Sequence, residues 1–214
     1  MVVFLTNINK IKTMRKIILM AVLAMVSIMA TAQSSTEARK ILDKTAAVVG
    51  RKGGASAEFK VSSAKIGTVN GTIAIKGRMF HARTPKAIVW YNGKTQWSYM
   101  QSTNEVNVST PTAAQKMKMN PYTFLTMYKS GYTLSMTRKG GNYNVHMVAQ
   151  NKGLSVQEVD LTITSSYIPT TVKMREGQTW TTINISNFKA ANLPNSTFTF
   201  NAKDFPSAEV IDLR

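Results

Sequence analysis

The strongest structural signal in the chain is the stretch Trp90-Tyr91-Asn92-Gly93-Lys94-Thr95-Gln96-Trp97. Its Asn-Gly pair accepts the positive φ angles of a type I′ turn, so the aromatic segments on either side predict a β-hairpin. With a two-residue loop, Ile88, Trp90, Trp97 and Tyr99 share one face of the hairpin. We expect this aromatic face to be buried, either in the core or against a ligand.

Alternation of apolar and polar residues predicts further strands on both sides of this hairpin. Gly140-Gly141 separates two of them and predicts a second hairpin, and the tail is expected to end in a short strand at 198–200. The count comes to about ten or eleven strands, nearly all with one wet face. The segments that carry the alternation are 57–62, 71–76, 80–83, 106–108, 132–136, 143–147, 159–163, 168–174 and 183–185.

Two segments show helical spacing instead. Residues 35–49 place apolar side chains at steps of three and four, and Gly50 follows as a stop. Residues 112–128 lose the alternation and predict one helix, or two short helices broken at Pro121. The methionines of this insert, Met117, Met119 and Met127, either fill gaps in a core or face a ligand beneath a movable lid.

This order of elements excludes a parallel α/β fold, because strands follow one another without alternating helices. The fold class predicted is mainly β with α. A sandwich or a strongly curved antiparallel sheet would fit the strands, and the helices need an apolar surface to cover. An open antiparallel half-barrel of about 11 strands, covered by helices, satisfies both requirements.

Residues 1–32 have the layout of a secretory signal peptide. Four basic residues precede a nearly apolar run over 17–30, and Ala30-Thr31-Ala32 supplies a cleavage site. The apolar run is shorter than the roughly 20 residues that cross a bilayer. We therefore expect cleavage after Ala32, export to the periplasm, and a single domain over 33–214. The translation start is either Met1 or Met14.

Charge and cysteine content narrow the class further. The chain has 27 Lys and Arg against 10 Asp and Glu. Residues 1–32 hold four of the basic and none of the acidic residues, which leaves 23 against 10, or +13. Such a surplus favours anionic partners, but export argues against nucleic acid. The chain has no cysteine, so it has neither a disulfide framework nor a thiol nucleophile.

Catalytic equipment is sparse. The two histidines, His81 and His146, both fall on the predicted wet face of their strands. The sequence contains no nucleophile elbow and no metal-ligand spacing. We therefore predict no catalytic residue, no metal site and no cofactor, and a protein that is not an enzyme.

Taken together, these residues resemble the periplasmic outer-membrane lipoprotein carrier family (LolA-like), in a divergent Bacteroides-type form. The similarity covers most of residues 35–205. Its most specific part is Gly71–Lys76, then Phe80 and Pro85, then Trp90–Tyr99; Asn107-Val108 and the segment 121–125 follow in the same order.

The resemblance implies a hydrophobic cavity that holds the acyl chains of lipoproteins in transit. It also implies partners: acylated lipoproteins, an inner-membrane lipoprotein-releasing transporter and an outer-membrane acceptor, with the carrier a monomer. Phe80 aligns with an apolar position near the cavity mouth that the family uses in partner contact. The expected cavity residues are Phe59, Val61, Ile73, Ile75, Phe80, Ile88, Trp90, Trp97, Tyr99, Met117, Met119, Phe124, Leu125 and Met127.

Arg78 is the candidate for a latch that holds the helical lid. In well-studied carriers an arginine directly before a proline does this by bonding to helix backbone, whereas this chain reads Lys76-Gly77-Arg78-Met79. The alternative function is a regulatory protein of the same fold that senses a lipid or a lipoprotein.

Overall fold

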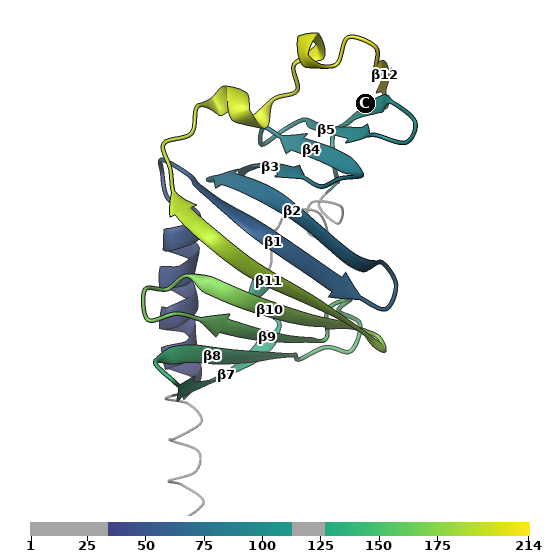
Figure 1. Cartoon of the computed structure of the whole chain (residues 1–214). Coiled ribbons are helices and arrows are strands. Elements are labelled where there is room, and N and C mark those ends of the chain that lie inside the picture. Colours follow the sequence, from purple (N-terminus) through teal and green to yellow (C-terminus); the bar gives the residue numbers. More distant parts are fainter. Residues whose placement is uncertain (1–33, 113–126) are drawn as a thin grey trace, which may run out of the picture.

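The computed structural model describes residues 34–112 and 127–214. They form a helix over residues 34–49, twelve strands and two short 3₁₀ helices (Figure 1). The strands are β1 (Ala55–Ser63), β2 (Gly67–Lys76), β3 (Met79–Arg83), β4 (Ala87–Tyr91), β5 (Gln96–Met100), β6 (Glu105–Ser109), β7 (Tyr132–Lys139), β8 (Asn142–Ala149), β9 (Glu158–Ile163), β10 (Pro169–Glu176), β11 (Thr179–Ala190) and β12 (Glu209–Asp212). The 3₁₀ helices are η1 (Asn195–Phe198) and η2 (Ala202–Asp204).

All twelve strands belong to one sheet in the order β12-β6-β5-β4-β3-β2-β1-β11-β10-β9-β8-β7. Neighbouring strands are antiparallel, apart from β12, which runs parallel to β6. β12 and β7 lie at the two ends of this order, so the sheet stays open. The predicted open antiparallel half-barrel is confirmed, with β12 as the strand that the alternation did not reveal.

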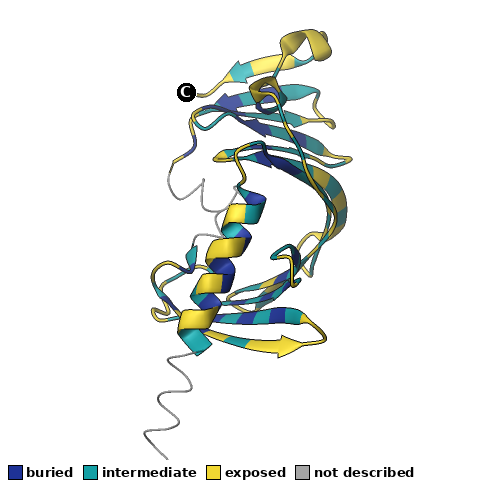
Figure 2. Ribbon diagram, turned by 90° about the vertical axis from the view of Figure 1, so that its left-hand side faces the viewer, coloured by how far each residue is buried: buried dark blue, intermediate teal, exposed yellow. Residues whose placement is uncertain are grey.

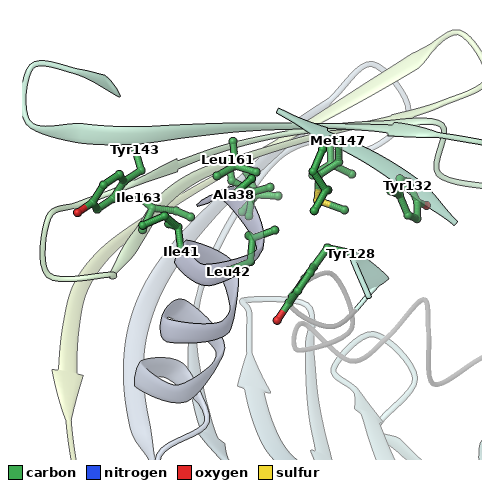
Figure 3. Packing of buried hydrophobic residues seen from close by; sticks show 13 residues of the cluster. Ala38, Ile41, Leu42, Tyr128, Tyr132, Tyr143, Met147, Leu161 and Ile163 are labelled. Carbon is green, nitrogen blue, oxygen red and sulfur yellow. The ribbon is translucent and has the colours of Figure 1, made fainter. Parts of the chain in front are cut away.

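The helix over 34–49 lies in the hollow of the curved sheet (Figure 2). Its buried side chains include Ala38, Ile41 and Leu42, so that Ile41 and Leu42 follow Ala38 at the expected steps of three and four. They pack against residues of β7 to β10, including Met147 and Leu161 (Figure 3). The helix forms because this apolar stripe has a complementary face to cover, as the sequence predicted.

A second, smaller cluster lies under the end of the helix. Val49 packs there with Ile75 of β2, Phe80 of β3 and Tyr91 of β4. The rings of Phe80 and Tyr91 have centroids 5.6 Å apart. The helix therefore crosses the hollow, from the β7–β10 side to the β2–β4 side.

The β4–β5 hairpin has the predicted place but a longer turn. Tyr91 pairs with Gln96, so four residues, 92–95, connect the strands rather than two. The Asn92 carboxamide oxygen accepts hydrogen bonds from the backbone N–H groups of Lys94 and Thr95, at 3.0 and 2.9 Å. This side chain closes the turn, while Gly93 takes the positive φ of 97°.

The C-terminal segment departs from the prediction. Residues 195–198 form η1 rather than leading into a strand at 198–200, and Phe198 is fully buried. η1 packs against β3 and β4. The chain then continues to β12, which pairs with β6 at the edge of the sheet.

Most of the predicted insert over 112–128 lies outside the described residues; residue 127 is helical and residue 128 lies in a turn. Within the two described ranges, no helix has the length and apolarity that crossing a membrane requires.

Candidate functional site

An apolar pocket of about 230 Å³ opens on the concave side of the sheet, beside the end of the helix. We call it the inner pocket. Apart from Ser56, every residue that lines it is apolar. The lining residues are Val49, Ala55, Ser56, Ala57, Phe59, Val61, Ile73, Ile75, Ala82, Pro169, Ile183, Ile185 and Phe188.

The pocket follows from strand register. Phe59 of β1 pairs with Ile185 of β11, and Val61 pairs with Ile183. On the other side of β1, Ala55 and Ala57 pair with Ile75 and Ile73 of β2. Because side chains of directly paired residues lie on the same face, three neighbouring strands place their apolar sets side by side.

These side chains are less covered than the rest of the concave face. Under the first part of the helix, Val145, Leu161 and Val172 are at most 1% exposed. Phe59, Val61 and Ile73 are only half-buried. Apolar surface left accessible in a hollow is what an apolar ligand covers.

Several predicted cavity residues do lie here. Phe59, Val61, Ile73 and Ile75 line the inner pocket. Phe80 is on the same face, buried in the cluster next to it. Met127 is half-buried against the cluster under the first part of the helix. Met117, Met119, Phe124 and Leu125 lie outside the described residues.

Four predicted cavity residues lie on the other face of the sheet, and their placement is corrected. Ile88, Trp90, Trp97 and Tyr99 share one face, as predicted, but this face is convex. Ala82, which lines the inner pocket, pairs with Val89, so the neighbours of Val89 in β4 point away from the pocket.

The C-terminal segment explains why this convex face is apolar. The ring of Phe205 lies 4.7 Å from that of Tyr99 and 5.6 Å from that of Trp90, between centroids. Phe200 also lies 5.5 Å from Trp90. β4 is thus apolar on both faces, and alternation alone does not tell which of them faces the hollow.

His81 lies on the same convex face as Trp90 and is half-buried there, rather than on a wet face. Its ring stacks on Trp90 at 5.4 Å. Burial, and secondarily the charge of Arg83, lower the pKa of His81 below its ordinary value of 6.5.

Most of the pocket wall that β11 supplies was not predicted from the sequence. Ile183 and Ile185 show a period of two, but their position beside β1 depends on a pairing across more than 120 residues. Val49 and Phe188 close the pocket at one end. No local pattern signals such long-range pairings.

Hydrogen bonds attach the first part of the helix to its surroundings. The Ser34 hydroxyl accepts from the Met136 N–H at 2.9 Å, and the Tyr128 hydroxyl donates to Asp43 at 2.5 Å. Lys44 donates to the Tyr167 hydroxyl at 3.0 Å; this bond raises the pKa of Lys44 and lowers the pKa of Tyr167.

Arginine contacts to the helix differ from the expected latch. Arg78 is exposed in the two-residue turn between β2 and β3, and the described residues offer it no hydrogen bond or ion pair. Instead, Arg39 on the helix donates to the backbone carbonyls of Tyr128 and Lys129, at 3.2 and 3.5 Å. The expected latch would place the arginine outside the helix and bond it to helix backbone. Here the arginine is on the helix and bonds to backbone outside it.

A polar cluster lies on the convex face of β8 and β9. Pairing of β8 with β9 brings His146 within 2.7 Å of Asp160 and 3.8 Å of Glu158. These three side chains are the group, within the described residues, whose ligand atoms lie close enough to hold a metal ion. Arg175 already pairs with Glu158 at 2.8 Å, which opposes a cation there.

Comparison with solved structures finds proteins similar to this chain. An uncharacterized conserved protein from Thermus thermophilus has 15% sequence identity and a TM-score of 0.56, over 82% of this chain and 99% of that one. A LolA superfamily protein from Nitrosomonas europaea has 12% identity and a TM-score of 0.45, over 76% and 97%. At 15% identity, the similarity to the Thermus thermophilus protein concerns the fold.

Comparison with curated protein sequences finds no match. The family model described as "Outer membrane lipoprotein carrier protein LolA" matches residues 28–178, which is more than half of the chain. That range includes the helix, β1 to β10, and most of the strand residues that form the inner pocket. The chain therefore belongs to the LolA family of outer membrane lipoprotein carrier proteins.

Proposed function

We propose that the protein binds the acyl chains of lipoproteins in the inner pocket and carries them across the periplasm to the outer membrane. The observation that supports this most directly is the pocket itself: an accessible, almost wholly apolar hollow on the concave side of an open sheet. In this proposal an inner-membrane transporter loads the carrier and an outer-membrane acceptor unloads it. The protein acts by binding rather than by catalysis.

The physical need for such a pocket is large. Each methylene of an acyl chain exposed to water costs about 0.8 kcal/mol, so one chain of about 16 carbons costs on the order of 10 kcal/mol. The inner pocket removes methylenes from water without offering charged groups that would have to be desolvated. Apart from Ser56, its lining side chains have no group that needs a hydrogen-bond partner on the ligand, so the pocket suits acyl chains in general.

Pocket size suggests how loading proceeds. A volume of about 230 Å³ lies below the roughly 300–1,000 Å³ of sites for drug-sized ligands, so it holds part of one acyl chain. Further chains need the end of the helix near Val49 to move off the sheet.

The test compares two substitutions at neighbouring positions of β2. Ile73→Glu places a charge in the inner pocket, and Ala74→Glu places the same charge on the other face of the strand. We expect Ile73→Glu to weaken palmitate binding by more than about tenfold, because the carboxylate would have to be buried against the chain.

Isothermal titration calorimetry with palmitate measures this, and circular dichroism checks that both variants fold. Ala74→Glu should bind palmitate like the unchanged protein. Equal affinities for the two folded variants, or no palmitate binding by the unchanged protein, would contradict the proposed site.

A further inference from the structure

A second hollow lies on the convex face of the sheet. We call it the outer groove; it is open and has a volume of about 900 Å³. Unlike the inner pocket, it has charged residues in its lining: Glu58, Lys60 and Arg83 line it and are exposed. None of these three forms an ion pair with the described residues. Tyr99 and Phe205 provide an apolar end.

One wall of the outer groove is a strand edge. β2 extends over Gly67–Lys76, but β3 pairs only with Thr72–Lys76. Residues 67–71 therefore have β1 on one side and, among the described residues, no strand on the other. Figure 1 shows the first part of β2 running beyond the end of β3.

The structure keeps β3 from continuing along this edge. After Arg83, the Thr84 N–H and hydroxyl both donate to the Ala87 carbonyl, at 2.9 and 3.1 Å, which closes a tight turn around Pro85. A proline has no N–H to donate to a neighbouring strand. The ladder ends at Thr72, and at the next residue of the edge, Gly71, an added Cβ would lie 2.4 Å from the Arg83 carbonyl oxygen.

Ladder geometry indicates which main-chain groups are free. Lys76 and Met79 flank the two-residue turn between β2 and β3, so they are a hydrogen-bonded pair. Going from Lys76 toward the start of β2, every second residue directs its N–H and C=O to the same side as Lys76 does, which is the side of β3. Asn70 and Thr68 continue that set, and their main-chain groups point to the unpaired edge.

The outer groove and the inner pocket meet at Phe59. This residue lines both hollows, and its ring lies against Gly71, where an added Cβ would come within 2.5 Å of it. A ligand whose acyl chain enters the inner pocket past Phe59 would have its polar end close to the free edge of β2.

We propose that the free edge of β2 binds the extended peptide that follows an acylated residue, by adding it to the sheet as a strand. This inference rests on the proposed function, because it gives a binding site on the protein to the peptide part of the same lipoprotein ligand. Five residues of edge span about 16 Å at roughly 3.3 Å per residue. Main-chain hydrogen bonds do not depend on side chains, so this mode suits clients whose peptides differ in sequence.

The experiment compares three probes by isothermal titration calorimetry. They are palmitate, a palmitoylated hexapeptide of alternating serine and alanine, and the same lipopeptide N-methylated at residues 2 to 5. We expect the plain lipopeptide to bind at least about fivefold more tightly than palmitate, since one net main-chain hydrogen bond contributes about that factor. The methylated lipopeptide, which lacks the donors, should bind like palmitate.

Two variants locate the effect. Asn70→Pro removes the N–H at the edge, whereas Asn70→Ala keeps the N–H and removes only the side chain. Asn70→Pro should lose about fivefold in lipopeptide affinity and none in palmitate affinity, and Asn70→Ala should lose neither. Hydrogen exchange at Thr68 and Asn70 should slow with the lipopeptide but not with palmitate.

The outcomes separate this inference from the proposed function. Palmitate binding without any effect of the peptide or of N-methylation would overturn strand addition and leave the acyl pocket standing. A dimer that Asn70→Pro dissociates, again without a peptide effect, would assign the edge to a second copy and overturn the inference as well. Absence of palmitate binding would instead contradict the proposed function. If Asn70→Pro does not fold, the comparison of methylated and plain lipopeptides still shows whether the peptide binds by strand addition.

Discussion

His81 shows how one side chain can couple folding to pH. It lies half-buried with its ring stacked on Trp90, and no hydrogen-bond partner is found for its Nε2 within the described parts of the chain. Burial disfavours the charged imidazolium, which is why the pKa falls. In the unfolded chain the same ring titrates near its ordinary value.

We expect stability to fall as the pH decreases below about 6.5, because the unfolded state then binds a proton that the folded state resists. The loss levels off below the folded-state pKa, where both states are protonated. Urea unfolding between pH 5 and 8 measures it. His81→Phe keeps the stacking on Trp90 but cannot titrate, so its profile should be flatter; parallel profiles for the two proteins would contradict this role.

The helix over 34–49 is attached to the sheet through one strong contact that side-chain patterns do not reveal. The Tyr128 hydroxyl donates to the Asp43 carboxylate at 2.5 Å, and Tyr128 is also packed in the cluster under the helix. A hydrogen bond to a charged acceptor is stronger than one between neutral groups.

Tyr128→Phe should therefore lower the free energy of unfolding by about 1–2 kcal/mol. It should also speed hydrogen exchange in residues 34–49. Tyr132→Phe is the matched control, since its hydroxyl donates to the Val156 carbonyl at 2.8 Å and not to the helix. A helix whose exchange rises equally in both variants would argue against the Tyr128–Asp43 contact as its specific anchor.

The C-terminal segment acts as a cover for the outer face of β4 and β5. Phe205 contacts Tyr99 and Trp90 there, on the side of the sheet opposite to the inner pocket. Phe205→Ala should lower the free energy of unfolding by about 1–3 kcal/mol, less than a fully buried phenylalanine, because this side chain is half-buried.

Palmitate affinity should stay within about twofold in Phe205→Ala, since one ring removed on the outer face leaves the pocket lining intact. Urea unfolding and calorimetry measure the two quantities separately. Ile73→Glu should show the opposite pattern, with lost binding. A large loss of palmitate affinity in folded Phe205→Ala would place the acyl site on the aromatic face after all.

For the whole molecule, we propose that the chain is exported to the periplasm, loses residues 1–32 and binds acyl lipid there. Cleavage after Ala32 would leave a chain with a net charge of +13, and the described helix begins at residue 34. The intact mass of protein from the periplasm should match residues 33–214, and native mass spectrometry should detect bound acyl lipid. Leu23→Arg interrupts the apolar run, so this variant should keep residues 1–32 and stay in the cytoplasm. Periplasmic protein of full length would contradict the predicted signal peptide.

Local patterns were sufficient for most of the elements in the described residues, though not for β12 or for η1. The helix over 34–49 and the hairpins at Asn92-Gly93 and Gly140-Gly141 follow from periodicity and turn chemistry, and the open sheet follows from having many one-sided strands and a helix to cover. Phe59, Val61, Ile73 and Ile75, four of the expected cavity residues, line the inner pocket, because a single alternation defines the inner face of β1 and β2.

The side on which Ile88, Trp90, Trp97 and Tyr99 lie depended on distant segments. β4 is apolar on both faces, and the tail that covers one of them is about a hundred residues away in the chain. The pocket wall from β11 likewise arises from pairing between Phe59 and Ile185. Periodicity indicates which residues share a face, since it reflects residues close together in the chain. Which face meets the hollow is set by contacts between segments far apart in the chain, and these form only in the folded protein.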